Sequence, residues 1–216
     1  MTPTLITTFR DRVDAGRRLG ERLQGRELRD PLVLGIPRGG VVTGLTLARE
    51  LGAELDVVLA RKLRAPYQPE FALGAVSEDG RVTLNPDARH APGVSPDYLA
   101  TEKRHQLAEI ARRKELFRAV RPPARVTGRS VIVTDDGIAT GSTMIAALRA
   151  VRAEHPHELI MAVPVAPPER LEQMRPLCDA VVCLLAPHDF HAVSQFYDAF
   201  DAVEDDEVLR LLRETV

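Results

Sequence analysis

The chain has few aromatic residues, few cysteines and little net charge. Aromatic residues make up 4% of the 216 residues, tryptophan is absent, and the two cysteines are Cys178 and Cys183. So few cysteines argue against a disulfide framework or a metal site and favour reduced structural thiols. The formal net charge of -2 gives no general attraction to nucleic acid, so any anion-binding site must be local.

Long apolar runs are also missing. No stretch is long enough to span a membrane, and the first residues lack the charged and apolar blocks of a signal peptide. The cytoplasm is therefore the expected compartment. Hydrophobic residues at 44% and charged residues at 28% are typical of an ordinary globular protein, and the length fits a single domain over residues 1–216.

Apolar runs alternate with helical patterns along most of the chain. Strands are expected at 31–37, 55–62, 130–136, 157–166 and 179–185, with helices between most of them. Continuous apolar strands that alternate with helices predict an α/β fold, a doubly wound and mostly parallel sheet. In such sheets ligands bind outside the carboxyl ends of the strands, where the unusual loops of this chain also lie.

Two regions interrupt or follow this alternation. Residues 71–85 predict a β-hairpin around Glu78-Asp79-Gly80, and residues 95–120 predict a charged helix with Ser95 as its cap. We expect a covering loop, a hairpin and a helical insertion over about 63–128, and a C-terminal hood or tail over about 186–216. The aromatic residues near 190–200 either face a ligand as part of that hood or form a small apolar patch that anchors the tail.

The stretch "DDGIATGST", residues 135–143, carries the strongest chemical signal. Gly137 and Gly141 let the backbone turn and expose its N–H groups, and Thr140, Ser142 and Thr143 add hydroxyl donors where a helix begins. A phosphate suits this loop, whereas the two acids before it suit vicinal hydroxyls, or a magnesium ion bound through water. A sugar phosphate satisfies both halves. A solvated turn before a capped helix is the alternative, and the whole arrangement argues against it.

This stretch resembles the signature of the type I phosphoribosyltransferases, and the chain resembles an uncharacterised bacterial branch of that family. The resemblance implies that Asp135 and Asp136 bind the ribose hydroxyls of phosphoribosyl pyrophosphate, with Mg²⁺ held there through those hydroxyls or water. It places the loop around the 5-phosphate, through Gly137, Ala139, Thr140, Gly141, Ser142 and Thr143. The sequence itself suggests no other partner for the two acids.

The stretch "IPRGG" supplies a second backbone anion site, because Arg38, Gly39 and Gly40 follow a strand and open a helix. The resemblance implies that this stretch is the pyrophosphate loop, which in this family often carries a non-proline cis peptide bond. The Pro37–Arg38 bond is the candidate. The alternative is a turn whose glycines only permit close packing.

In "ARKL", Arg61 and Lys62 are expected to end a strand beside the first one. Two cations at that position could neutralise a pyrophosphate, and several family members carry an Arg-Lys pair at the start of their mobile loop. The alternative is a pair of solvated surface cations. The residues expected to act in catalysis are Arg38, Arg61, Lys62 and, as a general base on the covering loop, Glu70.

The resemblance implies displacement of pyrophosphate from C1 of phosphoribosyl pyrophosphate by a nitrogen of a nucleobase-like acceptor. Ala139 stands where members acting on 6-oxopurines carry Asp, so hypoxanthine and guanine are disfavoured as acceptors. Neither nucleic acid nor a membrane is an expected partner, and a homodimer is left open. The competing function is a non-catalytic regulatory protein of the same fold that senses phosphoribosyl pyrophosphate.

Overall fold

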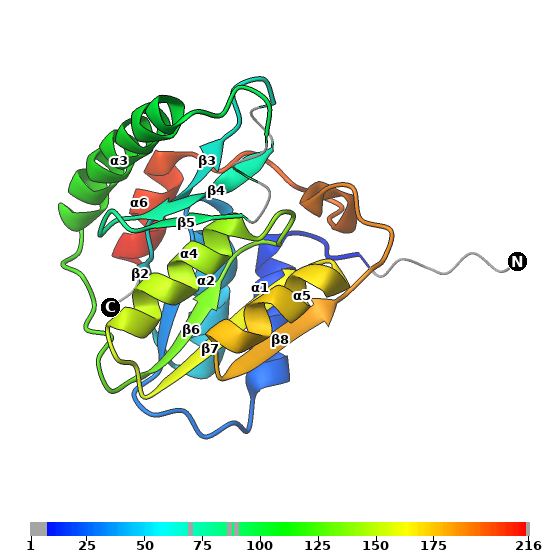
Figure 1. The fold of residues 1–216 in the computed structure, drawn as a ribbon. Coiled ribbons are helices and arrows are strands. Elements are labelled where there is room, and N and C mark those ends of the chain that lie inside the picture. The colour runs from blue at the N-terminus through cyan, green and yellow to red at the C-terminus, as the bar shows by residue number, and fades with distance from the viewer. Residues whose placement is uncertain (1–7, 69–70, 86–87, 89–90, 215–216) are drawn as a thin grey trace, which may run out of the picture.

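A five-stranded parallel sheet forms the centre of the molecule (Figure 1). The computed structural model describes residues 8–68, 71–85, 88 and 91–214. The strand order is β2-β1-β6-β7-β8. Their bounds are β1 Leu32–Gly35, β2 Glu54–Val57, β6 Ser130–Thr134, β7 Glu158–Val165 and β8 Ala180–Leu185.

Helices cover both faces of this sheet, as predicted. Helices α1 (Arg12–Leu23) and α2 (Gly39–Leu51) pack on the face that presents Val33 and Ile132. Helices α4 (Ser142–Ala153) and α5 (Pro168–Met174) pack on the face that presents Val131 and Val133. The sheet residues alternate between these two apolar clusters because successive side chains of a strand point to opposite faces. The doubly wound α/β fold is confirmed.

A second, antiparallel sheet corrects the strand expected at 55–62. That run divides into β2 and a separate strand β3 (Ala60–Arg64), which pairs with β4 (Ala72–Ser77) and then β5 (Val82–Leu84). The division falls at Val58 and Leu59, where the carbonyl of Leu59 accepts the N–H of Glu78, the residue after β4, instead of continuing beside β1. No glycine or proline marks the break, so hydrophobicity alone could not locate it.

Helix α3 (Pro96–Arg118) lies against this second sheet and the C-terminal helix α6 (Asp205–Arg213) (Figure 1). Ser95 caps it by accepting the N–H of Tyr98, as predicted. Its far end is tied to the central sheet, because Arg118 binds both carboxylate oxygens of the buried Asp56 in β2 at 2.7 and 2.9 Å. The insertion is therefore anchored to the core at its C-terminal end.

The C-terminal aromatic residues form an apolar patch, the second of the two expected alternatives. Phe196 and Tyr197, at the end of the short helix η3 (Val193–Phe196), are buried against Phe9 from the start of the chain. The ring centroids of Phe9 and Tyr197 are 5.3 Å apart. These rings join the segment before α1 to the segment after β8. In the described part of the chain, no helix has both the length and the apolar character that a bilayer crossing requires.

Candidate active site

Strand pairing brings two of the predicted loops side by side. Strands β1 and β6 are neighbours in the parallel sheet, and Gly35 is in register with Thr134 at their carboxyl ends. The N–H of Ile36 then donates to the carbonyl of Thr134 at 2.9 Å, so the segments that follow β1 and β6 leave the sheet side by side. The loop after β1 contains Arg38, and the loop after β6 begins at Asp135. The predicted pyrophosphate loop and the acid pair are therefore in contact.

This contact leaves no room for a side chain at Gly39 or Gly40 of the first loop. A Cβ atom added to Gly39 would lie 1.9 Å from Oδ2 of Asp136, and one added to Gly40 would lie 2.9 Å from Asp135. The glycines do permit close packing, as the alternative interpretation held, and what packs there is the acid pair. The peptide bond between Pro37 and Arg38 is cis, as predicted.

The acid pair is held in an environment that disfavours two negative charges. Burial raises the pKa of Asp135 well above its ordinary value, and the neighbouring charge of Asp136 raises it further. Burial also raises the pKa of Asp136, although the Arg12 guanidinium opposes the shift. A cation or a hydroxyl donor arriving at the pair would relieve this repulsion.

Asp136 has a partner that the sequence did not suggest. Nε of Arg12 in α1 donates to Oδ2 of Asp136 at 2.8 Å, and its Nη1 donates to the carbonyl of Asp201 at 2.8 Å. The same guanidinium lies 3.8 Å from the ring centroid of Phe200, and the hydroxyl of Tyr197 donates to the carbonyl of Asp136 at 2.6 Å. The N-terminal helix and the C-terminal segment thus fix the orientation of this acid. In the sequence, Arg12 belongs to an ordinary charged helix and gave no signal.

The carboxylate oxygens of Asp135 and Asp136 show whether the acid pair could bind Mg²⁺. Oδ1 of Asp135 accepts the N–H of Asp136, and Oδ2 of Asp136 accepts Arg12. The two carboxyl side chains also hydrogen-bond to each other, so the pair offers hard oxygen ligands once both carboxyls are ionised. No group of three or more metal-binding side chains occurs in the described part of the chain. Mg²⁺ therefore fits as an ion that completes its coordination with water or ligand oxygens.

The loop that follows the acids is built to expose its backbone. Within the described residues, no acceptor takes the N–H groups of Ala139, Thr140, Gly141, Ser142 and Thr143. Gly141 has a φ of 82°, a left-handed conformation that suits glycine, and it precedes the first turn of α4. A cavity of about 170 Å³ lies against this loop and is lined by Asp135, Gly137, Ile138, Ala139, Thr140, Gly141, Thr143, Met144 and Val193.

One hydroxyl of the loop is already in use. Ser142 is buried, and its Oγ accepts the side-chain N–H of Asn85 at 3.2 Å, at the end of β5. The hydroxyl of Ser142 therefore joins α4 to the residue that follows β5. Thr143 lines the cavity, and Thr140 is an exposed residue of the same lining.

The predicted cations occupy three different settings. Arg38 forms an ion pair with Glu204 at 2.6 Å, with 34% of the Arg38 side chain and 69% of the Glu204 side chain exposed. Arg61 lies in β3, not at the end of a strand beside β1, and its Nε donates to Gln106 of α3 at 2.7 Å. Lys62 is the next residue of the same strand, so its side chain points to the opposite face of the second sheet. The Arg-Lys pair is therefore not a single two-cation clamp.

The covering loop is mostly the connection between β3 and β4. Leu63 and Arg64 belong to β3, the N–H of Ala65 donates to the carbonyl of Phe71, and the N–H of Phe71 donates to the carbonyl of Gln68. The candidate base Glu70 lies outside the described residues.

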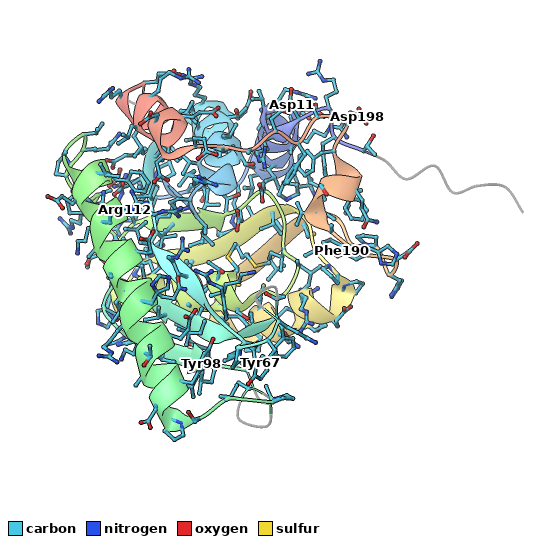
Figure 2. The ribbon with its side chains drawn as sticks, turned by 90° about the horizontal axis from the view of Figure 1, so that it is seen from above. Asp11, Tyr67, Tyr98, Arg112, Phe190 and Asp198 are labelled. Carbon is cyan, nitrogen blue, oxygen red and sulfur yellow. The ribbon has the colours of Figure 1, made fainter. Side chains whose placement is uncertain are left out.

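Viewed from above, Arg112 of α3 lies on one side of the molecule and Phe190 and Asp198 lie on the other (Figure 2).

Comparisons with known proteins agree with this arrangement. Residues 9–201 match the family described as the phosphoribosyl transferase domain. A Mycobacterium tuberculosis protein, provisionally named a phosphoribosyl transferase, is 42% identical over 204 residues, which are 94% of this chain and 46% of that protein. The chain thus spans about half the length of the curated relatives that it matches.

Solved structures give the same result for the fold. The crystal structure of TT1426 from Thermus thermophilus is 47% identical with a TM-score of 0.81, over 96% of this chain and 99% of that one. The structure of the AQ2163 protein from Aquifex aeolicus has a TM-score of 0.50 at 13% identity, over 81% of this chain and 74% of that one, and shows similarity of fold alone. With the match over residues 9–201 and the relative that covers most of the chain, the protein belongs to the phosphoribosyl transferase domain family.

Proposed function

We propose that this protein transfers the 5-phosphoribosyl group from phosphoribosyl pyrophosphate to a nitrogen of a nucleobase or a related acceptor. The observation that carries the proposal is that one acid of the pair and the exposed N–H groups line a single cavity. A sugar phosphate offers hydroxyls for the acids and a phosphate for the backbone, so one ligand satisfies both parts.

In this proposal the acids and the loop hold the ribose 5-phosphate half of the ligand. Carboxylate oxygens of Asp135 and Asp136 accept hydrogen bonds from the ribose hydroxyls. The N–H groups of residues 139–143 donate to the 5-phosphate, with the hydroxyls of Thr140 and Thr143 as further donors. Bound Mg²⁺ would supply charge stabilisation to the departing pyrophosphate.

The pyrophosphate half lies over the loop after β1. The N–H groups of Arg38, Gly39 and Gly40 donate to no described residue and are available for an anion. The exposed Arg38–Glu204 pair contributes little to stability, so a ligand can displace Glu204 from Arg38. Arg61, held by Gln106 of α3, is a further proposed cation for this half of the ligand. Lys62 and Glu70 remain proposed participants that would act from the hairpin.

The reaction breaks the bond between C1 of the ribose and an oxygen of pyrophosphate, whose oxygen keeps the electron pair. A ring nitrogen of the acceptor forms the new bond to C1 and loses its proton. Charge develops on the leaving group and on the sugar, so donors fixed in advance lower the barrier more than flexible ones would. Ala139 offers no carboxylate to the acceptor, which favours acceptors other than hypoxanthine and guanine.

The test is a panel of nucleobases incubated with phosphoribosyl pyrophosphate and Mg²⁺, with release of pyrophosphate as the measurement. We expect release with at least one base, and loss of release in the Asp135→Asn variant. Binding of phosphoribosyl pyrophosphate without release for any base would favour the regulatory alternative. Absence of both binding and release would refute the proposal.

A further inference from the structure

Three guanidinium groups from separate parts of the chain are electrostatic neighbours. Arg38 lies in the loop after β1, Arg61 lies in β3, and Arg113 lies in α3. Burial lowers the pKa of the Arg113 guanidinium, Asp205 opposes the shift, and Arg38 lowers the pKa further. Burial also lowers the pKa of Arg61, and the charge of Arg113 is the next largest cause. Each cation therefore acts on another.

Arg113 is poorly satisfied where it stands. Its side chain is only 13% exposed, and its Nη2 atom is 3.7 Å from Oδ1 of Asp205, which is too long for a hydrogen bond. Nε of Arg113 and Oδ1 of Asp205 are both buried without a hydrogen-bond partner among the described residues. Asp205 instead binds the neighbouring Arg112 at 2.9 Å. A buried guanidinium in this state gains from an additional anion.

The cluster cannot relieve its repulsion by losing protons, because arginine stays protonated in proteins. Its counter-charges come from the start of α6, where Glu204 pairs with Arg38 and Asp205 lies between Arg112 and Arg113. Glu109 of α3 adds a negative charge that acts on Arg61 and Arg113. Gln106 holds Arg61 through a neutral side chain, which adds no negative charge. A ligand with several negative oxygens would complement the cluster better than these acids do.

We propose that Arg113 of α3 binds the pyrophosphate group of phosphoribosyl pyrophosphate, together with Arg38 and Arg61. The charged helical insertion is then part of the active site, and the acids at the start of α6 hold its cations until the ligand arrives. This inference rests on the proposed function, because it assigns a residue to the pyrophosphate half of that ligand. The inference adds a contact between α3 and the pyrophosphate group to those made by the loops after β1 and β6.

The test compares Arg113→Gln with Lys114→Gln by titration calorimetry. Lys114 is the next residue of α3 and is exposed, so its variant loses the same charge outside the cluster. The probes are phosphoribosyl pyrophosphate with Mg²⁺, inorganic pyrophosphate, and ribose 5-phosphate, which lacks the pyrophosphate group. We expect Arg113→Gln to weaken binding of the first two by about tenfold or more and to leave ribose 5-phosphate unchanged. Lys114→Gln should match the wild type for all three.

The two failures can be told apart. If the wild type binds phosphoribosyl pyrophosphate and Arg113→Gln binds it equally well, this inference is wrong and the proposed function stands. If pyrophosphate binds through Arg113 but phosphoribosyl pyrophosphate and ribose 5-phosphate do not bind, the proposed function fails and the pyrophosphate contact stands. Equal losses for all three probes would show a structural effect and overturn the inference. If the Gln variant does not fold, Arg113→Lys replaces it: this variant keeps the charge but loses the planar fork of the guanidinium, and we again expect weaker binding of the first two probes alone.

Discussion

At the scale of single residues, we expect the buried carboxyl of Asp135 to lower the stability of the protein. Burial and the charge of Asp136 raise its pKa well above the ordinary value. Between the ordinary and the raised pKa, the folded protein holds more protons than the unfolded chain, so this carboxyl lowers stability as the pH rises. An asparagine at the same position keeps an oxygen for the N–H of Asp136 without the charge.

We therefore expect Asp135→Asn to melt at a higher temperature than the wild type, by a margin that grows as the pH rises through the range between the ordinary pKa of aspartate and the raised pKa of Asp135. Melting curves of both proteins across this range measure the margin. Glu115→Gln is the control, because Glu115 is exposed on α3. A margin that stays constant with pH would show that the buried charge does not limit stability.

Gly39 gives a second residue-scale prediction. A Cβ atom at this position would lie 1.9 Å from Oδ2 of Asp136, the oxygen that Arg12 also binds. Gly39→Ala must therefore displace either the loop or the carboxylate, at a cost of about 1–3 kcal/mol in the free energy of unfolding. Chemical denaturation measures that cost, and calorimetry with phosphoribosyl pyrophosphate measures the accompanying loss of affinity. Wild-type affinity in the alanine variant would contradict the contact between the two loops.

At the scale of elements, α3 depends on its anchor at the central sheet. The side chain of Asp56 is 3% exposed. Both of its carboxylate oxygens accept hydrogen bonds from Nη1 of Arg118, the last residue of the helix. The N–H groups of Val57 and Ala124 also donate to this carboxylate. Removing the guanidinium would leave a buried carboxylate that only backbone groups satisfy.

We expect Arg118→Met to lower the free energy of unfolding by about 3 kcal/mol, because breaking a buried ion pair from one side is costly. Chemical denaturation measures the change. Arg104→Met is the matched control on the exposed face of the same helix, and it should stay within about 0.5 kcal/mol of the wild type. Similar losses in both variants would mean that helix propensity or solubility, not the anchor, determines the result.

The elements also show which parts of the site the sequence could predict. The loops after β1 and β6 were predictable because each is contiguous in the chain and follows a short apolar strand. The division of residues 55–62 into two strands was not, because the carbonyl of Leu59 bonds to Glu78, a residue distant in the chain that follows β4 of the other sheet. The opposite directions of Arg61 and Lys62 follow from that division, since the pair lies within a strand and not at its end.

At the scale of the whole molecule, the contacts that complete the site join distant parts of the chain. Arg12 and Asp136 are 124 positions apart, and Tyr197 reaches Asp136 from the C-terminal segment. Arg113 lies in a helix whose charges are spread along the sequence without a motif. Such contacts depend on the packing of α1, α3 and the C-terminal aromatic residues around the sheet. No local pattern in the sequence could therefore have assigned these residues to the site.

The central claim is that the acid pair and the two loops bind phosphoribosyl pyrophosphate. Titration calorimetry of this ligand with Mg²⁺, in the wild type and in Asp135→Asn, tests it most directly. We predict saturable binding with one site per chain in the wild type and a loss of about tenfold or more in the variant, close to 1.4 kcal/mol. The absence of binding in the folded wild-type protein, or equal affinity in the variant, would contradict the account.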